Sequence, residues 1–99
     1  MGFGTFYGRL TVAKYCPWRR QLTLDFHDVN DVKGLGVAVV ELPVLTFVTL
    51  IEGDAVDIEL PFGVILEITD EDWGKLREFW MENRGKTVSD LYEPIVRRW

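Results

Sequence analysis

Cys16 and His27 are the side chains of this protein that most readily serve as nucleophile and base, and each is the only residue of its type. Arg19 and Arg20 follow the cysteine closely, in the stretch KYCPWRRQL. A phosphatase-type cysteine loop needs an arginine six positions after the cysteine, and that position is Leu22. A cysteine–histidine pair would depend on a single histidine in the following strand. The sequence therefore predicts no nucleophilic site, and we expect a protein that is not an enzyme.

Carboxylates dominate residues 51–72, which include eight acidic residues and no basic one. Asp57 and Glu59 share one face of a predicted strand, but acid–base or metal chemistry would need a cleft with further polar partners. The sequence offers no such cluster, so we expect no metal and no cofactor. These acids are either a solvated surface or a face for a basic protein partner. The predicted partner-binding residues of this acidic face are Glu52, Asp54, Asp57 and Glu59.

The first 20 residues have the opposite balance, with four basic residues and no acidic one. Aromatic and arginine side chains on a sheet can stack on single-stranded nucleic acid. Strict alternation would place Tyr7, Arg9, Thr11, Ala13 and Tyr15 on one face. The predicted partner- or phosphate-binding residues of this basic hairpin are Arg9, Lys14, Trp18, Arg19 and Arg20. The net charge of −5 argues against strong non-specific nucleic-acid binding, but leaves room for a local basic patch where the two chain ends meet.

The composition is that of one ordinary globular domain, because 47% of its 99 residues are hydrophobic and 27% are charged. A lone cysteine excludes an intramolecular disulfide and fits a reducing, cytoplasmic setting. The start of the chain, MGFGTFYG, has no basic region and no long apolar run, so we expect no signal peptide. The apolar stretch GVAVVELPVLTFVTLI is interrupted by Glu41 and Pro43 and falls short of the ~20 residues of a transmembrane helix. We expect no membrane contact, and buried strands in this stretch.

Strands are expected over the first two-thirds of the chain. TFYGRLTVAKY and RQLTLDFHDV alternate apolar and polar residues, as half-buried antiparallel strands do, and YCPWRR is the predicted turn between them. VAVVEL and VLTFVTLIE follow, and the second is apolar on both faces, which predicts a central strand covered on both sides. DAVDIEL alternates again, with Val56, Ile58 and Leu60 inward, and VILEI is a short last strand.

The hydrophobic period changes in TDEDWGKLREFWMENRG, which predicts a helix over about residues 70–84. Thr69 is the expected N-cap, and three acids in the first turn complement the helix dipole. Gly85 is a natural residue to end the helix. The tail around Pro94 predicts short helical turns, because its apolar residues have helical spacing. One apolar stripe of the main helix comprises Trp73, Leu76, Phe79 and Trp80.

Two stretches carry a family resemblance. GRLTVAKYCPWRRQLTL is similar to the first hairpin of pleckstrin-homology domains, and ILEITDEDWGKLREF resembles their closing strand and tryptophan-bearing helix. The resemblance covers about a third of the chain. It implies a seven-stranded barrel capped by that helix, and binding of inositol phosphates through the first hairpin. On this resemblance Lys14, Arg19 and Arg20 would hold phosphate.

The predicted fold is α+β: an antiparallel, strongly curved sheet of five or six strands, with a C-terminal helix packed on one face and a short helical tail. The absence of a catalytic constellation, the segregated charge and the many aromatic residues favour a non-catalytic protein-binding module. Small intracellular regulators, including inhibitors carried by viruses or mobile elements, have this profile. Nucleic-acid or phosphoryl-ligand binding through the basic hairpin is the alternative. Pairing of an edge strand or of the Trp99 tail could also produce a homodimer.

Overall fold

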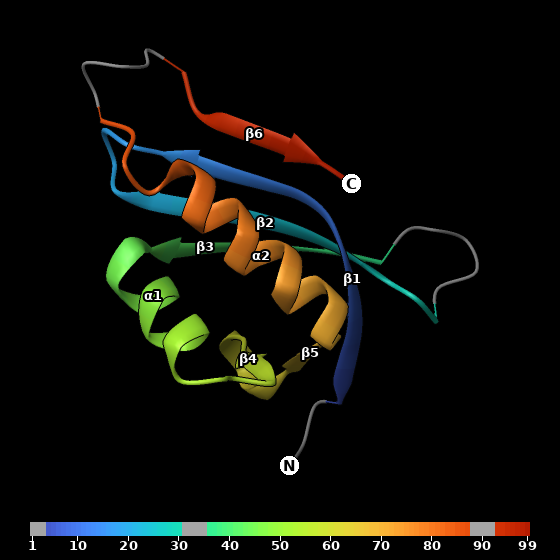
Figure 1. The fold of residues 1–99 in the computed structure, drawn as a ribbon. Coiled ribbons are helices and arrows are strands. Elements are labelled where there is room, and N and C mark those ends of the chain that lie inside the picture. The colour runs from blue at the N-terminus through green and yellow to red at the C-terminus, as the bar shows by residue number, and fades with distance from the viewer. Residues whose placement is uncertain (1–3, 31–35, 88–92) are drawn as a thin grey trace.

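The computed structural model describes residues 4–30, 36–87 and 93–99. Six strands, two α-helices and one 3-10 turn follow one another along the described chain (Figure 1). In order, they are β1 (Thr5–Cys16), β2 (Gln21–Asp28), β3 (Val37–Pro43), α1 (Val44–Glu52), β4 (Asp57–Glu59), η1 (Pro61–Gly63), β5 (Ile65–Ile68), α2 (Asp70–Asn83) and β6 (Ile95–Arg98).

The strands form a curled, mixed sheet in the order β3-β2-β1-β5-β4, and β6 pairs with the second half of β1. The predicted α+β class and the curved sheet of five or six strands are confirmed. The prediction of a purely antiparallel sheet is wrong, because β1 and β5 pair in parallel, with Thr5 opposite Ile65 and Gly8 opposite Ile68. The long chain between β1 and β5, which includes α1, provides the crossover that a parallel pair needs.

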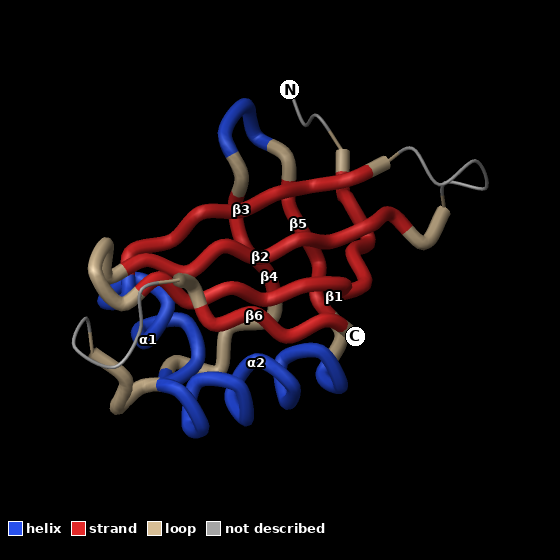
Figure 2. Tube along the Cα trace, turned by 90° about the horizontal axis from the view of Figure 1, so that it is seen from above, coloured by secondary structure: helices blue, strands red, loops and turns tan. Residues whose placement is uncertain are grey.

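Both helices lie on the same side of the sheet (Figure 2). The core between the two layers includes the inward residues of β2 and the apolar stripe of α2, and the Trp73 and Trp80 side chains are only 2% and 9% exposed. Every second residue of β2 is partly or fully exposed. These residues lie on the face of the sheet away from the helices, and no helix of the described residues covers that face. They are Gln21, Thr23, Asp25 and His27. The sheet therefore has one buried and one open face.

A β-bulge in β1 reverses the alternation predicted for its second half. Leu10 is opposite Phe26 while Val12 is opposite Asp25, so Thr11 is the extra residue. As a result Ala13 and Tyr15, expected on the same face as Tyr7 and Arg9, are instead buried in the core. The single face of five residues predicted for this strand is therefore wrong.

The stretch VLTFVTLIE is a helix, α1, and the prediction of a central strand there is wrong. Its apolar residues at positions 44, 47, 48 and 51 have the spacing of one helix face, and all four pack in or against the core. Leu45 on the other side is 77% exposed. Pro43 ends β3 because it cannot donate to a further ladder. The stretch contains many β-branched residues, which are enriched in strands, and this composition favoured the strand prediction over the helical spacing.

The C-terminal tail forms strand β6 rather than the predicted helical turns, at least over Ile95–Arg98. Residues 88–92, the rest of the predicted helical tail, lie outside the described residues. β5 pairs only with residues 5–8 of β1, which leaves the later edge of β1 available. β6 occupies it, with Val12 opposite Arg98 and Tyr15 opposite Ile95. Unpaired strand edges attract further strands, which explains why the tail extends here.

Two further expectations differ from the structure. Val56, predicted to face inward, is 67% exposed, because β4 begins one residue later at Asp57. The seven-stranded barrel implied by the resemblance to pleckstrin-homology domains is not the observed fold. The described residues form six strands in a sheet that is open between β3 and β4, and one strand pair is parallel.

Gly8 lies where three strands meet, and the structure predicts that a side chain is not accepted there. A Cβ atom on Gly8 would lie 2.7 Å from Leu66 Cδ1 and 3.1 Å from Phe26 Cβ, both in the core. We expect Gly8→Ala to lower the free energy of unfolding by about 1–3 kcal/mol, measured by urea denaturation. Gly74→Ala is the matched control, because no atom lies within 4 Å of its Cβ position and the helix gains up to ~1 kcal/mol. Equal effects of the two changes would contradict this packing.

Candidate functional site

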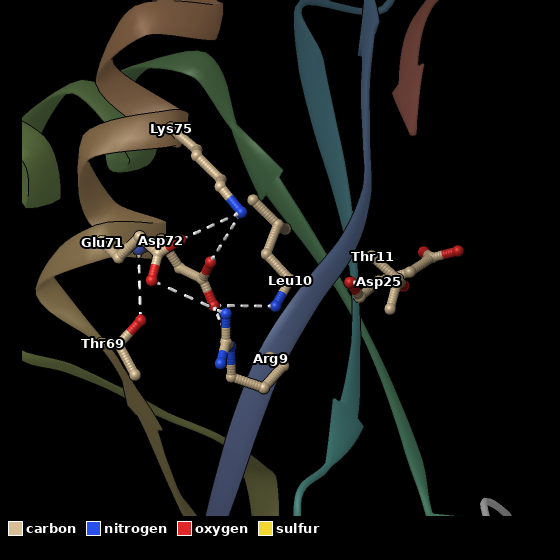
Figure 3. A network of polar contacts seen from close by, with 8 residues as sticks. All are labelled: Arg9, Leu10, Thr11, Asp25, Thr69, Glu71, Asp72 and Lys75. Atoms are coloured by element: carbon tan, nitrogen blue, oxygen red, sulfur yellow. Dashed lines mark hydrogen bonds and ion pairs between the residues drawn. The ribbon is translucent and has the colours of Figure 1, made fainter. Parts of the chain in front are cut away.

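A polar network joins the first turn of α2 to the middle of β1 (Figure 3). The Asp72 carboxylate is fully buried and accepts hydrogen bonds from the Leu10 backbone N–H at 2.9 Å and from Arg9 Nε at 3.3 Å. Lys75 Nζ lies 3.7 Å from its other oxygen. Leu10 falls in the gap between the part of β1 that pairs with β5 and the part that pairs with β6. Asp72 therefore supplies an acceptor that no strand of the described residues provides at Leu10, and its role is structural.

The structure separates Arg9 from the other residues of the predicted basic site. Arg9 forms ion pairs with Asp72 and Glu71 at the start of α2. Trp18, Arg19 and Arg20 form the tip of the β1–β2 hairpin, where the predicted turn is confirmed by hydrogen bonds from residues 19 and 20 back to the carbonyls of residues 16 and 17. The tip side chains are exposed. The ion pairs of Arg9 therefore link β1 to α2, while the exposed side chains of the hairpin tip are accessible to a ligand.

Lys14 and Cys16 lie side by side on the open face of the hairpin, close to the tip. Both line a cavity of about 290 Å³ together with Trp18 and Arg19. Cys16 pairs with Gln21 and His27 pairs with Arg9, at the two ends of the hairpin. Gln21 and His27 are six positions apart on an extended strand, which corresponds to about 20 Å. The structure therefore does not bring the cysteine and the histidine together.

The predicted acidic residues divide into two groups. Glu52 is the last residue of α1, and Asp54, two residues further on, forms an ion pair with Arg77 at 3.4 Å. Asp57 and Glu59 lie on β4, and Asp57 is opposite Glu67 of β5. Of these residues, Glu59 borders a cavity of the described sheet, because it lines a groove between β4 and β3.

This groove, called the edge groove below, is lined by residues 39–42 of β3 and by residues 58–61 of β4 and η1. Its volume is about 440 Å³, within the range of ligand-binding cavities. Val40, Leu42 and Ile58 contribute apolar side chains that belong to the core. The exposed carboxylates Glu41 and Glu59 stand on its two sides. The edge groove thus combines an apolar floor with an acidic rim.

No strand of the described residues pairs with the outer edge of β3, and the backbone of β3 directs polar groups to this free edge. Beyond the two ends of the β2–β3 ladder, the amide of residue 28 donates to the carbonyl of residue 36, and that of residue 44 to residue 20. Bonded pairs alternate along an antiparallel ladder, so this register makes Ala38, Val40 and Leu42 the bonded residues of β3. The N–H and C=O groups of Val39 and Glu41 consequently point away from β2, where β3 ends the strand order.

The same reasoning applies to β4, the other end of the strand order. The Leu60 amide donates to the Val64 carbonyl at 2.7 Å, and the amide of residue 68 donates to the carbonyl of residue 56. This register makes Ile58 a bonded residue and leaves the backbone groups of Asp57 and Glu59 on the free edge. Two free strand edges therefore border one groove.

Sequence reasoning missed the β3 side of this site, because it treated VAVVEL as a buried strand. Val37 and Val39 are 60% and 59% exposed. Glu41 is exposed as well, and its carboxylate accepts a hydrogen bond from Gln21 Nε2 at 3.3 Å. The signal in the sequence was the spacing of two between Val39 and Glu41, followed by Pro43, which is typical of an edge strand.

Comparison with known proteins gave no relative of this chain. No protein family, no curated protein and no solved structure matches it. In the part of the chain that the structure describes, no group of three or more histidine, cysteine, aspartate or glutamate side chains is arranged to hold a metal ion. The described helices are all too short or too polar to cross a membrane.

Proposed function

We propose that this protein is a non-catalytic binding module that takes up an extended segment of a partner protein in the edge groove. The observation that carries the proposal is the meeting of two free strand edges at one groove with an apolar floor. Addition of a strand to a sheet edge is a common mode of peptide recognition. A cytoplasmic regulator or inhibitor that occupies a partner's surface would act in this way.

The edge of β3 determines the direction and pattern of the proposed segment. A segment antiparallel to β3 would exchange backbone hydrogen bonds with Val39 and Glu41, and antiparallel pairs are slightly more stable than parallel ones. Its side chains opposite Val40 and Leu42 would enter the apolar groove. Those opposite Val39 and Glu41 would lie on the open face. The segment should therefore alternate apolar and outward-facing residues.

The charge of the rim selects a basic partner. Glu41 and Glu59 border the groove, and Asp57 with its cross-strand neighbour Glu67 adds further negative charge. Opposite charges on neighbouring strands stabilise the pair, and like charges destabilise it. The same argument disfavours a second copy of this chain, whose own β3 edge would bring a further Glu41. The outward positions of the segment should therefore be lysine or arginine.

A charge-reversal experiment tests the proposal. The probe is a fluorescent peptide of seven residues that alternates lysine and valine, and binding is measured by anisotropy. We expect Glu41→Lys with Glu59→Lys to weaken binding at least about tenfold, or 1.4 kcal/mol. Glu52→Lys with Glu78→Lys is the matched control, since it changes the net charge equally at exposed sites away from the groove. Equal weakening by both pairs would show that only net charge matters and would contradict the proposal.

A further inference from the structure

A second cavity, called the basic pocket below, lies between the hairpin tip and the C-terminal end of α2. Its volume is about 490 Å³. Its lining includes three aromatic and three basic residues: Tyr15, Trp18, Trp80, Arg20, Arg84 and Lys86. None of the lining residues that the structure describes is acidic. The pocket thus brings together basic residues that lie far apart in the sequence, since Arg20 and Arg84 are separated by 64 positions.

The cations of this pocket differ from most other basic side chains of the protein. Arg20, Arg84 and Lys86 form no ion pair with any carboxylate within 4.0 Å among residues 4–30, 36–87 and 93–99. Four other basic residues of that part each pair with an acid: Arg9, Lys75, Arg77 and Arg97. Three positive charges without an ion-pair partner in the described part of the chain therefore gather at one cavity, where an anion would be attracted.

The helix end alone does not account for this arrangement. The C-terminal carbonyls of α2 attract cations, which explains basic residues at positions 84 and 86. Arg20 comes from a different part of the chain, however, and lies at the hairpin tip with a φ angle of 52°. Left-handed backbone costs energy for a residue other than glycine, asparagine or aspartate. The hairpin tip therefore contributes a third cation to the cavity that Arg84 and Lys86 line at the helix end.

The aromatic side of the basic pocket is built on the core. The Trp80 ring contacts Tyr15 and Phe47 edge-to-face, with centroids 5.2 and 5.9 Å apart. These buried contacts fix the orientation of the Trp80 ring at the pocket wall. Trp18 is 40% exposed at the tip, so its ring is accessible to a ligand. Exposed aromatic rings next to cations are typical of sites that stack nucleobases.

We propose that the basic pocket binds a phosphate-bearing aromatic ligand, either a free nucleotide or a nucleotide of a single-stranded nucleic acid. The two arginines present several N–H donors to phosphate oxygens, and Lys86 adds a point charge. Trp18 stacks on the base. This inference is independent of the edge groove, because the two cavities share no lining residue.

The test uses three probes on the intact protein: inorganic phosphate, adenosine monophosphate and a fluorescent single strand of twelve thymidines. We expect the nucleotide or the oligonucleotide to bind with an affinity that falls as salt rises. Binding of the nucleotide alone identifies a free nucleotide as the ligand, and binding of the oligonucleotide with little nucleotide binding identifies single-stranded nucleic acid. No binding of either, or equal affinity for phosphate and nucleotide, would overturn the proposal.

Variants assign the binding to the basic pocket. Arg20→Ala with Arg84→Ala should weaken binding at least about tenfold. The control pair Arg77→Ala with Arg98→Ala removes the same charge outside the pocket and should change the affinity by less than about threefold. Trp18→Ala should weaken nucleotide binding, and thermal melting of each variant shows that the fold is retained. Equal loss in both arginine pairs would overturn the assignment.

Discussion

Asp72→Ala is expected to lower the free energy of unfolding by about 2–4 kcal/mol, measured by urea denaturation. The buried carboxylate is the acceptor for the Leu10 N–H in the gap between the two ladders of β1. Its loss leaves that donor buried without a partner, which costs about 1–3 kcal/mol. It also removes a charge-assisted bond from Arg9, and such bonds are stronger than neutral ones.

Glu71→Ala is the matched control for the stability experiment. Glu71 precedes Asp72 in the same helix turn and pairs with Arg9 and Lys75, but its side chain is 67% exposed. Exposed ion pairs contribute about 0–1 kcal/mol, so we expect a small effect. Asp72→Asn should fall between the two, because the amide oxygen still accepts from Leu10. If Asp72→Ala and Glu71→Ala unfold at the same urea concentration, the buried network does not hold β1 to α2.

Val39→Pro is expected to weaken binding of the lysine–valine peptide strongly while the protein stays folded. The Val39 amide points to the free edge of β3 and takes no part in the ladder with β2. Proline lacks this donor and is tolerated on edge strands, so the variant loses the hydrogen bond to the added segment and not those of the sheet. The affinity, measured by anisotropy, should fall at least about tenfold.

Two further variants define what this result means. Val39→Thr keeps the amide and the branched shape, so it should bind the peptide nearly as well as the parent. Val40→Pro removes a donor that bonds to β2 and should destabilise the sheet, which circular dichroism and melting would show. If Val39→Pro is folded and binds the peptide with unchanged affinity, the segment does not pair with β3.

The elements with a clear local signal could be predicted from the sequence. The β1–β2 hairpin alternates around Pro17, and Thr69 caps α2 by accepting a hydrogen bond from the Asp72 amide. The errors concern elements whose form depends on distant partners. The tail became strand β6 because one edge of β1 was available. The bulge at Thr11 depends on the register with β2, which no pattern within β1 records.

The candidate sites were predictable only in part, for the same reason. Glu59 and the tip residues Trp18 and Arg20 were predicted as partner contacts, and the structure places them at the edge groove and the basic pocket. The sequence did not predict Glu41, which lines the edge groove with Glu59, or Arg84, which lines the basic pocket with Trp18 and Arg20. Which residues face one another across a cavity depends on the strand order and on how α2 packs against the sheet, and neither is encoded locally.

Amide hydrogen exchange, read by nuclear magnetic resonance with and without the lysine–valine peptide, tests the central claim most directly. In the free protein, we expect the Val39 and Glu41 amides to exchange much faster than those of Val40 and Leu42, which bond to β2. With the peptide bound, Val39 and Glu41 should become protected. Slow exchange of all four amides without peptide, or peptide binding that leaves Val39 and Glu41 unprotected, would contradict strand addition at β3.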